Sequence, residues 1–214
     1  MGHDSHTYEP GHYHHIEPEQ AYHGAKLGMW IFLATEVHLF GGVFCTFAIF
    51  RWKYLEAFNE YARTLNWQLG ALNTAFLLTS SYCMVRAVDA AQKGLNNRVK
   101  RWLDVTTIFG LLFFVVKYFE YSAKLVHHEP PITPSTHVFY GLYYVMTAIH
   151  AVHVLVGVGA IVWLRTLAAK NRFSPTYYTP VEVTGLYWHL VDVIWIFLYP
   201  TLYLLGGISL GAGH

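Results

Sequence analysis

The chain has 214 residues, of which 54% are hydrophobic and only 13% are charged. Because a soluble globular protein usually carries about 25% charged residues, this composition predicts an integral membrane protein. The formal net charge is +1, and no run of Lys or Arg is interleaved with aromatic residues, so nothing indicates a nucleic-acid partner. The two cysteines, Cys45 and Cys83, lie in apolar stretches and indicate neither a disulfide framework nor a zinc site.

Residues 1–25 are polar and rich in histidine, which gives this segment a different character from the rest of the chain. Histidine-rich tracts can bind copper or zinc weakly, but structural sites show a fixed ligand spacing that is missing here. We therefore expect a disordered or loosely attached tail. Its histidines are His3, His6, His12, His14, His15 and His23.

Five apolar stretches are long enough to cross a hydrocarbon core of about 30 Å as helices. They predict an all-α, polytopic membrane protein with a five-helix transmembrane bundle over residues 26–210. Nine Lys and Arg residues fall on one side of the predicted membrane and four on the other, which places the N-terminus inside and the C-terminus outside. The expected spans cover about residues 27–50, 67–88, 102–126, 137–164 and 183–208.

The first span places Glu36 near the centre of the bilayer. A carboxylate there costs at least about 2.5–3.5 kcal/mol unless it is paired, so its helix face must pack on protein or line a wet cavity. Two interpretations of Glu36 stay open, a helix-to-helix hydrogen bond and a functional proton site. The second span has no charge before Arg86 and contains the small polar residues of LNTAFLLTSS, which indicate a packing scaffold.

The third and fourth spans add further polar groups. Lys117 and Glu120 are three residues apart, a spacing that favours an ion pair within the helix. His150 and His153 share one face of the fourth span, where we expect a buried contact with a carboxylate such as Glu120 rather than a metal or haem. Glycines 157 and 159 should let this helix approach another closely.

The fifth span carries GLYWHLVDVIWIFLYP, in which His189 and Asp192 lie on one helix face with two tryptophans, and Glu182 stands at its start. A buried aspartate should point at another helix or a wet cavity, because it is costly in lipid. The polar residues of all five spans can therefore satisfy one another inside a bundle. No complete metal-ligand set is present among them.

These motifs, in this order, resemble subunit III of the haem–copper cytochrome c oxidases in its short five-helix bacterial form. The resemblance runs from about residue 26 to residue 207. It is carried by LGMWIFLATEVHLF with Glu36, LNTAFLLTSS, KYFEY with Glu120, AIHAVHVLVGV with His150 and His153, and YWHLVDVIWIFLY with His189 and Asp192. The last motif is the most specific.

The resemblance implies an accessory subunit of an oxidase in the bacterial cytoplasmic membrane, with haem and copper held by subunits I and II and none in this chain. Such a subunit packs on subunit I, binds phospholipid, and supports proton uptake and the durability of the active site. Glu36 matches the family's carbodiimide-sensitive glutamate. Seven-helix members of the family have two further helices before the position that matches residue 26, and the resemblance implies that this chain lacks their part of the cleft in which such members bind phospholipid.

Three alternatives stay open at this point. Subunit III of a quinol oxidase has the same fold, although the glutamate in LATEVHLF resembles the cytochrome c type. A stand-alone transporter or channel could use Glu36 and Asp192 as a proton relay, but the chain lacks the internal repeat and broken helices of such proteins. A di-haem membrane cytochrome would need histidines paired across helices at equal depth.

Overall fold

The computed structural model describes residues 18–126 and 134–204. The predicted histidine-rich tail, apart from residues 18–25, lies outside these ranges, and so does the end of the predicted fifth span from residue 205 onward. The all-α prediction is confirmed for the described residues. The elements are α1 (Pro18–Lys53), α2 (Leu55–Arg63), α3 (Trp67–Gln92), α4 (Asn96–Val126), α5 (Pro134–Ala169), α6 (Thr179–Tyr199) and the π-helical turn η1 (Pro200–Leu204).

Several helix ends differ from the predicted spans, and two features were not predicted at all. Helix α1 begins at Pro18, so residues 18–25 are helical rather than part of a loose tail. Helix α2 was not predicted, because it is a short amphipathic helix that buries only Phe58, Tyr61 and Ala62. A search for long apolar stretches cannot find such an element.

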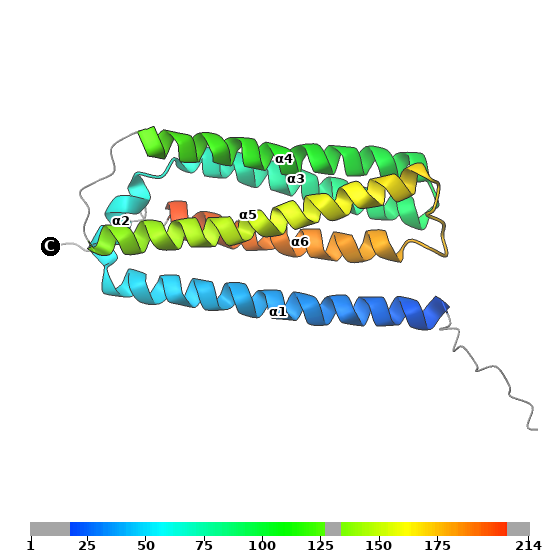
Figure 1. Cartoon of the computed structure of the whole chain (residues 1–214), viewed down its shortest axis with the longest axis horizontal. Helices are drawn as coiled ribbons and strands as arrows, with labels where there is room; N and C mark the ends of the chain where they lie inside the picture. Colours follow the sequence, from blue (N-terminus) through cyan, green and yellow to red (C-terminus); the bar gives the residue numbers. More distant parts are fainter. Residues whose placement is uncertain (1–17, 127–133, 205–214) are drawn as a thin grey trace, which may run out of the picture.

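Four helical segments within the described ranges are long and apolar enough to cross a membrane: Tyr22–Lys53, Asn96–Ala123, Pro134–Ala169 and Thr179–Leu204. Helix α3 is not among them, since the hydroxyl and amide side chains of its LNTAFLLTSS stretch lower its hydropathy. It nevertheless lies beside α4 along the length of the bundle (Figure 1). The chain is therefore a multi-pass membrane protein, while the fifth span and the orientation stay predictions.

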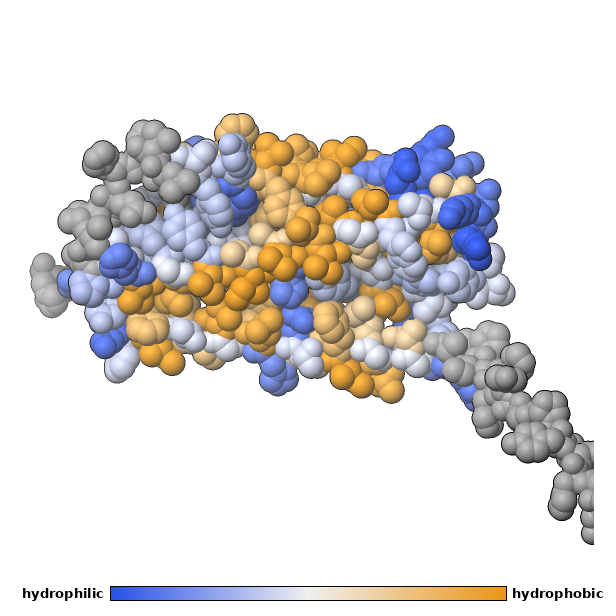
Figure 2. All heavy atoms as spheres, in the orientation of Figure 1, coloured by the Kyte–Doolittle hydropathy of each residue, from blue (hydrophilic) through white to orange (hydrophobic). Residues whose placement is uncertain are grey.

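Helices α3, α4, α5 and α6 pack into a bundle, and α1 lies along one side of it (Figure 1). In its most apolar stretch α6 is 50% buried and α1 only 17% buried, so α6 is central and α1 peripheral. Figure 2 shows apolar residues along the middle of the molecule and hydrophilic ones gathered at the end where α4 begins and α5 ends. This distribution suits a protein surrounded by lipid at mid-height.

The connections are set by local side-chain chemistry. Asn66 caps α3, its Oδ1 accepting hydrogen bonds from the backbone N–H of Gln68 at 3.1 Å and of Leu69 at 3.3 Å. Gly94 follows α3 with φ of +68°, a left-handed conformation that favours glycine. Asn96 donates to the carbonyl of Phe173 at 2.8 Å, which ties the α3–α4 turn to the α5–α6 connection.

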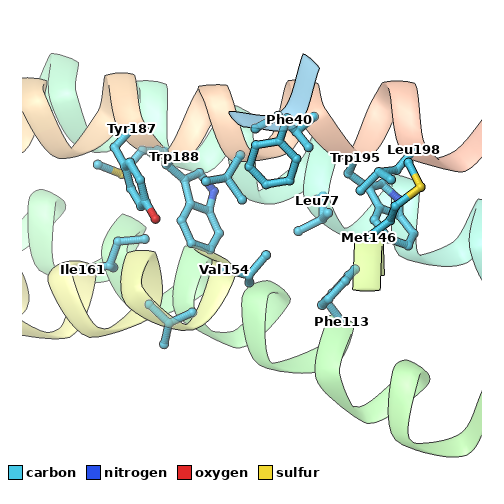
Figure 3. Packing of buried hydrophobic residues seen from close by; sticks show 14 of the residues in the cluster. Phe40, Leu77, Phe113, Met146, Val154, Ile161, Tyr187, Trp188, Trp195 and Leu198 are labelled. Carbon is cyan, nitrogen blue, oxygen red and sulfur yellow. The ribbon is translucent and has the colours of Figure 1, made fainter. Parts of the chain in front are cut away.

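Trp188 on α6 is fully buried at the centre of the bundle (Figure 3). A Cβ atom added to Gly157 on α5 would lie 2.7 Å from its ring, and one added to Gly110 on α4 would lie 3.0 Å away. These two glycines therefore make room for the indole. Gly159 has nothing within 4 Å of such an atom, so the prediction that it permits a close approach is wrong.

This arrangement gives the first testable prediction. Gly157→Ala should destabilise the bundle by about 1–3 kcal/mol, because Trp188 has no space in which to move away from the new methyl group. Gly159→Ala is the matched control on the same helix and should be near neutral. Thermal unfolding of the purified protein in detergent measures both. Equal melting temperatures for the two variants would contradict the packing described here.

Candidate functional site

Glu36 on α1 pairs with His153 on α5, with Oε2 and Nε2 2.9 Å apart. The Glu36 side chain is only 13% exposed and that of His153 only 18%. Phe40, one turn along α1, packs edge-on against the imidazole. Both titratable residues lie near the middle of their helices, where an unpaired carboxylate would be most costly.

The hydrogen bond of the second ring nitrogen, Nδ1, determines which atoms of the Glu36–His153 pair can carry a proton. Its Nδ1 lies 2.7 Å from the carbonyl oxygen of Ile149, and a carbonyl can only accept, so Nδ1 carries a hydrogen. The contact between Nε2 and the Glu36 carboxyl then needs one further proton shared between them. The Glu36–His153 pair is thus either imidazolium with carboxylate or imidazole with carboxylic acid, and in both forms it holds one exchangeable proton.

A second polar group, the Glu120 cluster, consists of Lys117, Glu120, Tyr143 and Tyr203. Lys117 donates to Glu120 Oε2 at 2.9 Å and to the Tyr203 hydroxyl at 2.6 Å. Both tyrosine hydroxyls donate to Glu120 Oε1, Tyr143 at 2.8 Å and Tyr203 at 2.6 Å. The Lys117 and Glu120 side chains are 6% and 2% exposed. The cluster therefore joins α4, α5 and η1 through a buried ion pair.

The ion pair within the third predicted span is confirmed by the Glu120 cluster. A histidine of the fourth predicted span does contact a carboxylate, but the pair is His153 with Glu36 of α1, and Glu120 is not the partner. His153 is turned toward α1, and His150 packs against Phe113 and Trp195 rings at centroid distances of 5.4 and 5.1 Å. Tyr143 takes the place on Glu120 that a histidine was expected to fill.

Glu182 closes the other end of the bundle. It accepts a hydrogen bond from the Tyr22 hydroxyl at 3.1 Å and pairs with Lys26 at 2.7 Å, and Lys26 also donates to Tyr22 at 2.7 Å. These contacts join the first turns of α1 to the start of α6. Glu182 is therefore a helix tie near the membrane surface rather than part of the central groups.

His189 and Asp192, which were predicted to share a helix face, have different surroundings. His189 Nδ1 lies 2.7 Å from the Ser81 hydroxyl of α3. Asp192 is 3% exposed, and neither carboxyl oxygen makes a hydrogen bond within the described ranges. Ser81 is close enough to interact with that carboxyl, although its hydrogen bond goes to His189. Asp192 therefore faces another helix, α3, as expected, although no hydrogen bond to its carboxyl is formed among the described residues.

Asn73 and His150 share this condition, since both are completely buried and their side-chain nitrogen and oxygen atoms have no hydrogen-bond partner among the described residues. By contrast, the tryptophans beside them are satisfied by α3 hydroxyls: Trp188 donates to Ser80 at 3.0 Å and Trp195 to Thr74 at 3.1 Å. The scaffold role expected for α3 therefore includes accepting hydrogen bonds from α6.

Sequence reasoning missed the tyrosines. Tyr143, Thr147 and His150 follow one another at spacings of four and three, which marks one polar stripe on α5, and Thr147 indeed bonds to Tyr121 at 2.6 Å. That stripe could have indicated which face of α5 makes polar contacts with α4. Within residues 18–126 and 134–204, no three His, Cys, Asp or Glu side chains lie close enough together to hold a metal. That this chain holds no redox centre stays a prediction.

Comparison with known proteins gives one consistent family. The family model described as cytochrome c oxidase subunit III matches residues 7–207. The chain is 33% identical over 180 residues to cytochrome c oxidase subunit 3 of Corynebacterium diphtheriae, covering 83% of this chain and 86% of the relative. It is 32% identical over 202 residues to the Synechocystis protein of the same name, covering 93% and 82%.

A third relative is named as a subunit of a quinol oxidase instead of a cytochrome c oxidase. The probable quinol oxidase subunit 3 of Staphylococcus haemolyticus is 27% identical over 191 residues, covering 87% of this chain and 91% of the relative. All three relatives are third subunits of oxidases, and the family model spans nearly the whole chain. The chain belongs to the cytochrome c oxidase subunit III family.

Proposed function

We propose that this chain is the accessory third subunit of a cytochrome c oxidase in a bacterial cytoplasmic membrane, where it packs on subunit I near subunit II. The oxygen-reducing haem and copper would reside in those partners. The proposal is supported by the family match and by the apolar surface at mid-height, which offers area to lipid and to partner helices (Figure 2). An exposed apolar band of this kind is ordinary for a membrane subunit.

The electron donor is a finer part of this proposal. The cytochrome c oxidase relatives from Corynebacterium and Synechocystis are 33% and 32% identical to the chain, and the quinol oxidase relative from Staphylococcus haemolyticus is 27% identical. The glutamate in LATEVHLF, Glu36, also resembles the residue found in subunit III of the cytochrome c oxidases. Quinol oxidation is the second candidate because the quinol oxidase relative covers the chain equally well.

The observation that carries the functional proposal is the Glu36–His153 pair. It holds one exchangeable proton, it is partly screened from its surroundings, and it lies on the peripheral helix α1. A protonatable pair at this depth is expensive if it serves only packing. We propose that it supports proton supply to the oxidase and the integrity of subunit I during turnover. Bound phospholipid on the apolar surface belongs to the same proposal.

Replacing Glu36 separates the proton role from packing. Glu36→Gln keeps a hydrogen-bonding side chain beside His153 and removes ionisation, whereas Glu36→Ala leaves His153 Nε2 unsatisfied at a cost of about 1–3 kcal/mol. We expect normal initial oxygen consumption from both. The Gln variant should release fewer protons per electron or lose activity faster during turnover, measured with the assembled oxidase in vesicles.

His38→Gln is the matched control, because His38 lies on the same helix and, among the described residues, bonds only to the Ala34 carbonyl of its own helix. It should behave as the unmodified oxidase does. If both Glu36 variants assemble and match that oxidase in proton release and in turnover lifetime, Glu36 is a structural residue and the proton role is wrong.

The Glu120 cluster is expected to be structural. Glu120→Leu leaves the Lys117 ammonium buried without its carboxylate and should destabilise the bundle by about 3–5 kcal/mol. Adding Lys117→Met to the same chain should restore most of this loss, because no uncompensated charge then remains. Thermal unfolding of the purified oxidase reports both. Lys93→Gln, which opens the exposed pair with Asp89, is the control and should change little. A double variant as unstable as Glu120→Leu would contradict this account.

A further inference from the structure

A separate feature lies at the hydrophilic end of the bundle, where α3 ends and α4 begins. A pocket of about 380 Å³ is lined by Arg86 of α3 and by Arg98, Arg101, Trp102 and Val105 of α4. We call it the arginine pocket. It is far along the chain from the Glu36–His153 pair, and the functional proposal makes no use of it.

Three positive charges in one pocket need an explanation. Arg86 stacks over the Trp102 ring at 5.6 Å, but within the described ranges none of the three guanidinium groups makes a hydrogen bond or an ion pair. Arg98 also lies in the first turn of α4, where the positive end of the helix dipole disfavours a cation. The three guanidinium groups are exposed and are available to an anionic ligand.

The nearby carboxylates are already engaged elsewhere. Asp89 accepts two hydrogen bonds from Lys93, at 2.7 and 2.9 Å, and Asp104 is bonded by Arg165 of α5. Neither acid lines the pocket. Asp89 is near enough to Arg86 and Arg98 to interact with them, but its hydrogen bonds go to Lys93. The three arginines of the pocket therefore keep their hydrogen-bond donors for an anion from outside.

The pocket continues into apolar surface on the side toward mid-membrane. Val105 lines it, and Ile108, three residues further along α4, is 55% exposed. On α3, Tyr82 precedes Arg86 by four residues on the same face and is 59% exposed. A small soluble anion would contact only the arginines, whereas a lipid with an anionic headgroup would contact both parts.

We propose that the arginine pocket binds the phosphate of an anionic phospholipid, whose chains lie along the exposed α3 and α4 surface below it. Guanidinium groups match phosphate oxygens in pairs, and basic pockets between membrane helices suit anionic headgroups. This inference rests on the membrane embedding of the chain and is independent of the proton role of Glu36.

The test uses the intact oxidase, stripped of lipid in detergent, with native mass spectrometry counting the lipids retained. Phosphatidylglycerol, phosphatidylcholine and inorganic phosphate are the three probes. The oxidase should retain one more phosphatidylglycerol than the Arg98→Gln/Arg101→Gln variant does. Each arginine removed should weaken that binding about fivefold. Lys100→Gln removes a charge from the same turns but not from the pocket, so it should bind as the unmodified oxidase does.

The outcomes separate cleanly. The proposal would be overturned if the double-arginine variant and the Lys100 control retained the same number of phosphatidylglycerol molecules and bound them with the same affinity. Retention of phosphatidylcholine as strong as that of phosphatidylglycerol, or displacement of the lipid by inorganic phosphate at equal concentration, would show that no anionic lipid is selected and would also overturn it. None of these results bears on proton release, so failure here is distinguishable from failure of the functional proposal.

Discussion

The high cost of an unpaired charge in hydrocarbon governs how this bundle is assembled. Two carboxylates illustrate it, since Glu36 pairs with His153 and Glu120 with Lys117. Nearer the membrane surface, Glu182 pairs with Lys26. Two of these pairs link different helices, and the third is joined to α5 and η1 by tyrosine hydroxyls. The charges therefore determine which helix faces meet. Close packing such as that of Trp188 against Gly157 adds to this, whereas transfer of apolar surface out of lipid does not, because lipid is as apolar as the helices.

The peripheral position of α1 connects this constraint with the proposed function. Helix α1 is held to the bundle by the Glu36–His153 pair at mid-height and by Glu182 with Lys26 and Tyr22 at one end. Since most of its apolar surface is not covered by this chain, partner helices or lipid must cover it in an oxidase. A proton-holding pair beneath such a helix is well placed to couple subunit packing with protonation. The same geometry explains why one residue could serve both roles.

What the sequence could predict depended on whether a contact lies within a helix or between helices. The Lys117–Glu120 pair follows from a spacing of three residues, and the need for Glu36 to face protein follows from its depth. Which of His150 and His153 pairs with Glu36 cannot be predicted from the spacing of residues within one helix. It depends on the rotation of α5 relative to α1 and α4, which no periodicity within one helix specifies. The unmatched Asp192 belongs to the same problem, since its surroundings come from three helices.

The most direct test of this account is the protonation state of His153 in the assembled oxidase. Nitrogen-15 labelling of histidine and solid-state NMR, with His153→Gln to assign the resonances, would measure both ring nitrogens. The account predicts a protonated Nδ1, and an Nε2 whose chemical shift reports a strong hydrogen bond and changes when Glu36 is replaced by Gln. An unprotonated Nδ1, or an Nε2 signal that is unchanged by the substitution at Glu36, would contradict it.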